Sequence, residues 1–323
     1  MEKRILIDLN DKKNWLYEST SPPSPSGAIV EENRVVLMPE GEHRLFAFTD
    51  AVMHHIPDGK IGEHEHHEGY ETFFVDSGSM AFYSFGEYCE LTKGDFVHIQ
   101  PYVTHGMDFH EDVRYRGIFQ DWATIDYFDE SFALRKVYPD APARMMEQGV
   151  SLGSYDFHVR EKTNYVKVAP EKINAVRNPS RPLKEFKYDG VTMKMMVGRW
   201  ECGGVREIWR AEMKKGFHAQ WDDFPIVPEL FYVTEGEVKF KVYEEEFTAH
   251  TDCLVKIPRL APRSLTALSD AAMYDIGGLP CWYGFIHDYT SMLELDPQRA
   301  KDPDVIKKLK DKTNVYIKSI GMS

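Results

Sequence analysis

Histidine is concentrated in one part of this 323-residue chain, where nine of the 13 histidines lie between residues 43 and 110. Within that part, His64 and His66 are two positions apart, and Glu71 follows after four intervening residues. Residues two apart on a β-strand point to one face, so both imidazoles can approach the same point. His105 follows a proline-containing turn, and the next strand can bring it beside them. Three imidazoles and a carboxylate are a suitable ligand set for a divalent transition metal.

Two other interpretations of this histidine-rich segment are open. Its histidines could lie on the surface of an acidic loop, or a helix could carry His64, His67 and Glu71 on one face. Gly69 and the strand-like pattern that follows it weaken the helical interpretation. Three neighbouring histidines are interpreted as structural residues rather than ligands: His54, His55 and His67.

The elements that must position these side chains are short strands. Runs of β-branched and aromatic residues closed by turn residues recur in both halves of the chain, and this pattern predicts antiparallel barrels or sandwiches rather than βαβ units. The predicted strands include Thr72–Val75, Met80–Phe85, Phe96–Ile99, Leu230–Val233, Val238–Tyr243 and Leu254–Ile257. At the C-terminus, Pro303–Lys312 begins with Pro and Asp and ends in lysines, an order that suits a short helix and its dipole.

An internal repeat divides the chain. Residues 71–105 align without a gap with residues 229–263, at a constant offset of 158. Glu71 then corresponds to Glu229, Gly78 to Gly236, and aromatic residues correspond to aromatic residues. We therefore predict two homologous barrels. The predicted domains are 1–165, with the metal site and a connector, and 166–323, with a degenerate barrel and the C-terminal helix.

The two elements H-x-H-x4-E-x6-G (His64–Gly78) and G-x6-P-x3-H (Gly94–His105) resemble the paired motifs of the cupin superfamily. The resemblance implies an all-β fold of two tandem cupin (double-stranded β-helix, jelly-roll) barrels with a few short helices. It implies that His64, His66, Glu71 and His105 bind one metal ion in the first barrel. Fe(II) is favoured, and Mn(II), Ni(II), Co(II) or Zn(II) would also suit the set.

The second barrel is expected to lack a metal, because Arg263 stands opposite His105 and a guanidinium cannot ligate a cation. Of the H-x-H pair, only His218 is expected to survive, with Gln220 two residues later. An internal Glu229–Arg263 ion pair would neutralise both charges. A role for Arg263 in binding an anionic ligand is the alternative.

If His105 and Glu71 point inward, alternation along their strands makes the pocket largely apolar, with Met107 and Phe109, and Phe73 and Val75, as neighbours. No catalytic residue can be assigned. Four side chains are candidates for substrate binding: Tyr83, Tyr102, Arg114 and Arg116.

Four protein ligands on a six-coordinate metal leave two adjacent positions free. We expect a metal-dependent enzyme that acts on a small organic anion, first of all a dioxygenase-type oxidoreductase of the kind this resemblance suggests. A non-redox lyase, isomerase or hydrolase is the alternative, and a non-catalytic small-molecule-binding cupin is the third possibility.

Composition indicates which partners and which cellular location to expect for the chain. Its net charge is −13, it has no basic tract, and nowhere do 18 consecutive apolar residues occur, so neither nucleic acid nor membrane is an expected partner. The N-terminus has no signal-peptide core, and the four cysteines form no CxxC pair. A cytoplasmic protein with reduced thiols is predicted, and a homodimer is possible.

Overall fold

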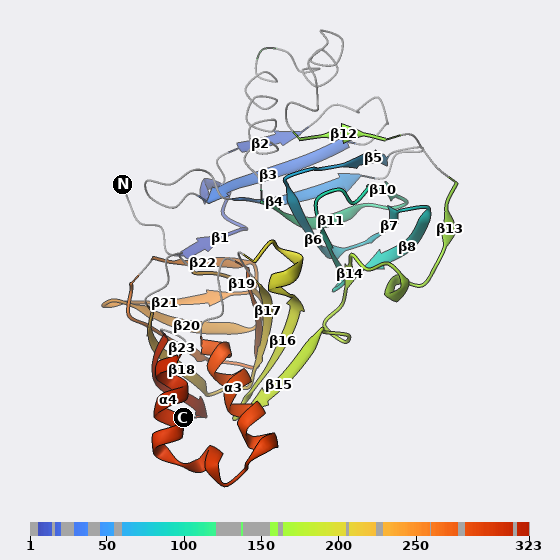
Figure 1. Cartoon of the computed structure of the whole chain (residues 1–323). Helices are drawn as coiled ribbons and strands as arrows, with labels where there is room; N and C mark the ends of the chain where they lie inside the picture. Colours follow the sequence, from blue (N-terminus) through green and yellow to red (C-terminus); the bar gives the residue numbers. More distant parts are fainter. Residues whose placement is uncertain are drawn as a thin grey trace. The chain divides into compact units, whose positions relative to one another are not determined.

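The computed structural model separates the chain into two compact units (Figure 1). Asp11–Asn178 form the first barrel, and Met1–Asn10 with Pro179–Ser323 form the second barrel. The structure describes residues 6–14, 17–20, 29–37, 46–54, 60–120, 137, 156–160, 164–204, 207–223, 229–258, 260–276, 282–312 and 315–322.

The first barrel consists of two sheets, in the strand orders β12-β5-β10-β7-β8-β13 and β14-β9-β6-β11-β4-β3-β2. Only β13, which pairs with β8, makes a parallel pairing among the described strands of this barrel. The elements are η1 (Lys12–Asn14), β2 (Tyr17–Thr20), β3 (Ile29–Leu37), β4 (Phe46–His54), β5 (Lys60–Glu65), β6 (Tyr70–Ser77), β7 (Ser79–Ser84), β8 (Glu87–Thr92), β9 (Phe96–Ile99), β10 (His105–Phe109), β11 (Val113–Gln120), β12 (His158–Val159), β13 (Val166–Lys167), η3 (Pro170–Lys172) and β14 (Val176–Arg177).

The second barrel also has two sheets, in the orders β1-β22-β19-β24-β17-β16-β15 and β21-β20-β23-β18-β25. The predicted C-terminal helix is confirmed as α4, which lies beside β25, and α3 lies beside β15 (Figure 1). The elements are β1 (Leu6–Asp8), β15 (Lys184–Tyr188), β16 (Val191–Val197), η4 (Arg199–Glu201), β17 (Ile208–Met213), β18 (Phe217–Asp223), β19 (Glu229–Glu235), β20 (Glu237–Val242), β21 (Glu245–His250), β22 (Cys253–Ile257), β23 (Arg263–Ala267), β24 (Ala271–Asp275), α3 (Trp282–Leu295), η5 (Arg299–Lys301), α4 (Pro303–Lys312) and β25 (Val315–Met322).

The repeat is confirmed strand by strand, including its register. Glu71 pairs with Ile99 across β6 and β9, and Glu229 pairs with Ile257 across β19 and β22, at the same offset of 158. Both copies also keep the glycine between the next two strands. At Gly78, φ is +77° and an added Cβ would lie 2.2 Å from the Asp112 carbonyl oxygen; Gly236 has φ +73° and meets the same kind of obstacle. Glycine is therefore required at both turns.

Each barrel is filled by the inward-facing residues of its two sheets. In the first barrel, Phe73 and Val75 from β6 belong to the same buried core cluster as Met107 and Phe109 from β10, and all four are at most 4% exposed. The alternation predicted for these two strands is thus confirmed. Burial of each such side chain is worth about 1.5–3 kcal/mol relative to exposure. This packing fixes the direction in which the other residues of the same strands point.

The observed units differ from the expected division at residue 165 in two respects. Residues 166–177 add β13 and β14 to the sheets of the first barrel, where they pair with β8 and β9. At the other end of the chain, β1 pairs with β22, so the N-terminal strand is part of the second barrel. Both differences come from long-range strand pairing, which leaves no local signal in the sequence.

The three described cysteines are buried and free of disulfides: Cys89, Cys202 and Cys253. Cys281 lies outside the described residues. In the part of the chain that the structure describes, neither helix has the length and apolarity that a membrane crossing needs.

Candidate metal centre

The four predicted ligands lie together inside the first barrel, although they come from both of its sheets. His64 is on β5, His66 directly follows the end of that strand, and His105 begins the neighbouring strand β10. His64 and His105 are direct partners in the β5–β10 pairing. Glu71 is near the start of β6 in the opposite sheet. The site thus lies between the two sheets.

One potential ligand atom from each of the four residues lies within 4.8 Å of every other. The Glu71 carboxylate is central, with one oxygen 3.1 Å from Nε2 of His66 and the other 3.0 Å from Nε2 of His105. The His64 ring is 4.2 Å from the His105 ring and 5.1 Å from the His66 ring, centroid to centroid. All four residues are at most 4% exposed.

Each imidazole is oriented by a backbone carbonyl on its other nitrogen. Nδ1 is 2.8 Å from the Gly62 oxygen in His64, 2.6 Å from the Asp156 oxygen in His66, and 2.9 Å from the Val103 oxygen in His105. A carbonyl oxygen can only accept, so each Nδ1 carries a proton and donates it. Nε2 of His105 lies at hydrogen-bonding distance from the Glu71 carboxylate. A bound metal would displace that proton and take the lone pair of the neutral ring, and second-shell bonds of this kind orient histidines that bind metals.

The protonation states agree with this arrangement. Burial, together with the charge of His105, lowers the pKa of His64 well below its usual value, so this imidazole stays neutral. Burial alone would raise the pKa of the Glu71 carboxyl, but the charges and hydrogen bonds of His66 and His105 outweigh it and hold this pKa well below its usual value. Ligands must be deprotonated to bind a metal. Three converging nitrogen lone pairs and an ionised, buried carboxylate therefore fit a divalent cation.

The substrate-binding candidates lie elsewhere. On β11, Tyr115 belongs to the barrel core, so the alternating positions Arg114 and Arg116 face away from it. Nε of Arg114 lies 4.0 Å and Nη1 of the fully buried Arg116 lies 3.6 Å from a carboxylate oxygen of Asp76. Both arginines thus pair with Asp76, and their role in substrate binding stays a prediction.

The two tyrosines are also outside the ligand cluster. Tyr83 is on β7 and donates a 2.7 Å hydrogen bond to Asp108, and burial raises the pKa of its hydroxyl. Both residues alternate with core residues of their strands and so point outward. Tyr102 is 62% exposed, with φ +65°, and its ring stacks on His67 at 4.5 Å. Its side chain lies outside the cluster, although its backbone N–H donates to the His66 carbonyl at 2.6 Å.

The second barrel has an ion pair at the corresponding position. Arg263 is paired with Glu229 through Nε at 2.7 Å and also through Nη2, and it donates to the Ala261 carbonyl. The backbone partner of Arg263 on β18 is Trp221, just as His64 is the partner of His105. Trp221 is therefore the counterpart of His64. His218, the expected survivor, is three residues away and binds Thr266 instead.

Two residues of the first site were missed by sequence reasoning. Asp156 and Phe157 lie in the stretch interpreted as a connector, yet the Asp156 carbonyl holds His66 and the Phe157 ring stacks on His64 at 4.1 Å. Asp156 is 90 positions from His66, and no spacing rule relates the two. Only the pairing of β12 with β5 brings them together.

Two further groups of possible ligands occur among the described residues: Asp8–His250–Cys253 and His67–Asp156–His158. Each contains residues that are partly exposed, whereas the first group is wholly buried. In the latter group, the Asp156 carboxylate is already occupied by three backbone N–H groups. Neither therefore matches the four-residue cluster as a metal site.

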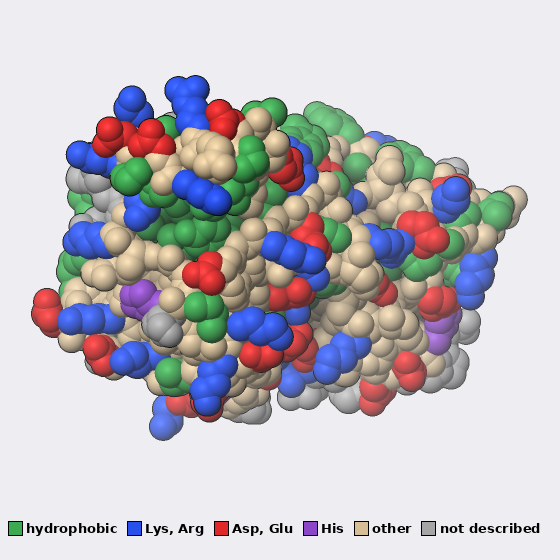
Figure 2. All heavy atoms as spheres, turned by 90° about the horizontal axis from the view of Figure 1, so that it is seen from below, with side chains coloured by type: hydrophobic (Ala, Val, Ile, Leu, Met, Phe, Trp, Pro, Cys, Tyr) green, Lys and Arg blue, Asp and Glu red, His purple; other side chains and the backbone are tan. Residues whose placement is uncertain are grey.

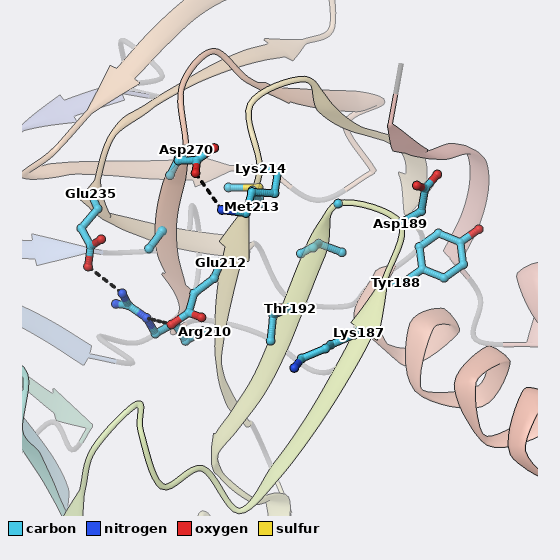
Figure 3. Close-up of a pocket in the computed structure, with 14 residues that line it drawn as sticks. Lys187, Tyr188, Asp189, Thr192, Arg210, Glu212, Met213, Lys214, Glu235 and Asp270 are labelled. Carbon is cyan, nitrogen blue, oxygen red and sulfur yellow. Dashed lines mark hydrogen bonds and ion pairs between the residues drawn. The ribbon is translucent and has the colours of Figure 1, made fainter.

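A groove of about 550 Å³ lies on the second barrel (Figure 3). Its cations are matched by carboxylates, since Arg210 binds Glu212 and Glu235 and Lys214 binds Asp270 (Figure 3). Basic and acidic side chains are also interspersed over the face drawn in Figure 2. The described lining holds three cations and four carboxylates, so the groove has no excess of positive charge that would select an anion, in contrast to the buried cluster.

Comparison with known proteins agrees with this architecture. Residues 51–118, which include all four clustered residues, match the model of the cupin domain family. No curated protein matches the chain. Among solved structures, the chain resembles the Bacillus subtilis oxalate decarboxylase whose Mn(II) centres were assigned by mutagenesis, with a TM-score of 0.54 and 11% identity over 99% of this chain and 90% of that one.

The Lactobacillus farciminis oxalate decarboxylase in complex with formate is also similar, with a TM-score of 0.51 and 12% identity over 95% of this chain and 97% of that one. Another oxalate decarboxylase structure, which addresses substrate binding and reaction specificity, gives 0.55 and 11% over 100% of this chain and 90% of that one. At such identities the likeness shows a shared fold. It extends over both barrels of the chain.

Proposed function

We propose that this chain, a two-barrel protein of the cupin superfamily, is an enzyme that uses one divalent metal ion to act on a small organic anion. His64, His66, Glu71 and His105 would hold the metal. The observation that carries the proposal is their common orientation: three Nδ1–H groups are held by carbonyls while three Nε2 atoms converge on one buried carboxylate. A bound divalent cation would displace the protons that the imidazoles share with Glu71, take their Nε2 lone pairs and offset the charge of the buried carboxylate.

The charge of the site favours an anionic substrate. Three neutral imidazoles and one carboxylate around a divalent ion leave a net charge of about +1. Apolar residues such as Phe73, Phe82 and Met107 belong to the same barrel interior, so this charge is weakly screened. The chain as a whole carries −13, and long-range attraction cannot gather anions. Recognition would therefore depend on the centre itself.

For the reaction, we favour non-redox cleavage of a small carboxylate, the lyase alternative of the sequence interpretation, over dioxygenation. The fold neighbours named above are oxalate decarboxylases, and one of them contains Mn(II). This supports a decarboxylation, in which a carbon–carbon bond breaks, carbon dioxide leaves, and a proton replaces it on carbon. It also supports Mn(II) rather than the Fe(II) preferred from the motifs alone. A bound metal would act as a Lewis acid toward the carboxylate oxygens.

The chain's own residues would bind and orient rather than transfer protons. The carbonyls of Gly62, Asp156 and Val103 fix the rings, and the proton that replaces carbon dioxide on carbon would be supplied by solvent water. Glu65 is adjacent to two ligands but alternates with them along β5 and binds Arg160. The hydrogen bond from Arg160 lowers its pKa to about 2, so it stays ionised and is a poor proton donor.

The proposal is tested in two stages. First, protein purified with added Mn(II) under nitrogen should contain about one equivalent of metal by elemental analysis, and a His66→Ala variant should contain none. Loading that is unchanged in the variant would show that the metal lies elsewhere. Elemental analysis of protein purified without added metal then identifies the native ion.

Second, loaded protein is screened against oxalate and other small mono- and dicarboxylates, with carbon dioxide release and net oxygen consumption followed together. Release of carbon dioxide without net consumption of oxygen supports the lyase. Consumption of one molecule of O2 per turnover would identify the reaction as a dioxygenation instead. Metal binding with no turnover of any anion would leave a small-molecule-binding protein. The cytoplasmic location and the homodimer stay predictions.

A further inference from the structure

The segment Asp156–Arg160, which we call the strap, runs antiparallel to the last three residues of β5. Its strand β12 pairs with β5, with His158 opposite Glu65 and Val159 opposite His64. The Arg160 N–H then donates to the Glu63 carbonyl at 2.8 Å. Without the strap, β5 would be the outermost of the described strands in its sheet, with one row of backbone groups unpaired. The strand that carries His64 is thus paired on both sides.

Asp156 binds the chain on both sides of His66. Its carbonyl accepts the Nδ1–H of the His66 ring at 2.6 Å. Its carboxylate accepts the backbone N–H groups of His67, Glu68 and Gly69 at 2.7–2.9 Å. These are the residues that join His66 to β6 and hence to Glu71. One residue therefore fixes the tautomer of one ligand and the backbone between two ligands.

The rings of the strap complete the contact. Phe157 stacks on His64 at 4.1 Å with an interplanar angle of 14° and meets the edge of the His66 ring at 5.7 Å. His158 stacks on His67 at 3.7 Å. Arg160 binds Glu65, which alternates with His64 and His66 along the chain. Successive residues of the strap thus contact successive residues of the ligand-bearing segment.

We propose that the strap positions the metal ligands, with Asp156 and Phe157 as positioning residues of the site. The inference rests on the proposed function, because it concerns the metal that His64, His66, Glu71 and His105 would hold. Partners of this kind set the direction of a ligand's lone pair, and their loss typically lowers metal affinity by about 10–100-fold. The strap is then part of the site's chemistry and not only of the barrel's stability.

A purely structural role can be separated from this one with a matched control. Asp95 is also 7% exposed and also closes a turn of the first barrel, where its carboxylate accepts the Thr92 N–H at 2.9 Å and the Asn178 amide at 2.7 Å. It touches none of the four ligands in these contacts. Asp95→Asn should weaken the fold about as much as Asp156→Asn while leaving the metal site intact.

The experiment uses the full chain with Mn(II) and Co(II) as probes. Dissociation constants come from competition with a chelator, the visible spectrum of bound Co(II) reports ligand geometry, and urea unfolding without metal gives stability. In Asp156→Asn the amide offers one acceptor oxygen, and its NH2 group faces backbone donors, so the turn after His66 shifts. We expect affinity to fall by about 10–100-fold with a changed Co(II) spectrum.

Asp95→Asn should keep the wild-type affinity and spectrum at a similar loss of stability. Phe157→Leu, which keeps the backbone pairing and the Asp156 contacts, serves as the second variant and should lower affinity by about 10-fold. It decides the question if Asp156→Asn does not fold. If Asp156→Asn and Phe157→Leu fold and bind metal with wild-type affinity, the inference about the strap is wrong, while the proposed function is unaffected. Failure of the wild-type chain to bind either metal removes the proposed function as well.

Discussion

The buried Glu229–Arg263 ion pair stands in the second barrel where the first barrel has its cluster, and its contribution to stability can be tested directly. Arg263 and Glu229 are 3% and 2% exposed, and their contacts leave the second Glu229 oxygen, Oε1, buried without a hydrogen bond among the described residues. In Arg263→Met the apolar side chain fits, but the Glu229 charge loses its partner. Breaking a buried pair on one side costs about 3–5 kcal/mol.

A loss of that size lowers the melting temperature of a domain of this length by about 10 °C. The matched control is Arg210→Met. Arg210 is joined to Glu212 and Glu235, but those partners have side chains that are 35% and 66% exposed. Water can take over their solvation, so we expect a loss of only about 1 kcal/mol.

The free energy of unfolding of both variants is measured in urea by circular dichroism and tryptophan fluorescence. Fluorescence reports on the Arg263 site because its guanidinium lies 5.6 Å from the Trp221 ring. In the double variant Glu229→Leu/Arg263→Met, both charges are gone and stability should return to within about 1 kcal/mol of wild type or exceed it. The reasoning is refuted if Arg263→Met costs no more than Arg210→Met, or if the double variant is less stable than the single one.

Three further predictions follow from the described contacts. His105→Ala should abolish metal binding. Its circular dichroism spectrum should stay that of the folded barrel, since Phe82, Met107 and their neighbours still fill the core. A variant that keeps one equivalent of metal contradicts the assignment. Arg263→His should not create a second metal site, because Trp221 stands where His64 does, and elemental analysis showing two equivalents would contradict this. Gly78→Ala should destabilise the first barrel by more than Gly94→Ala, because both have positive φ but only at Gly78 does an added Cβ meet backbone, at 2.2 Å. The positive φ accounts for about 1 kcal/mol in each, and equal losses in urea unfolding would show that the turn relaxes.

The cluster of His64, His66, Glu71 and His105 could be predicted because local spacing carries most of the information. The step of two between His64 and His66, and the five positions from there to Glu71, are properties of one short segment of chain. The internal repeat predicted the two-barrel architecture, since a constant offset of 158 assigned each strand of one half to a strand of the other. Alternation along β6 and β10 then predicted which neighbours are inside.

The two arginines of β11 show what alternation along a strand leaves open. Its sequence alternates between apolar and basic residues, so Tyr115 and the pair Arg114 and Arg116 must point to opposite sides. Which side lies inside is decided by packing, and Tyr115 contacts the Phe73 ring at 5.4 Å in the core. The apolar ring fills the interior, and Arg116 is left to pair with Asp76 on the other face.

The sequence by itself determined the types and spacing of the four clustered residues, the two-barrel repeat and the position of Arg263 opposite His105. Tertiary structure decided what surrounds them. Asp156 reaches His66 across 90 positions, and β1 joins the second barrel from the far end of the chain. Hydrogen bonds between distant strands depend on which edges are left unpaired once the sheets have formed. No local pattern of residues carries that information, so these contacts emerge only when the chain is folded.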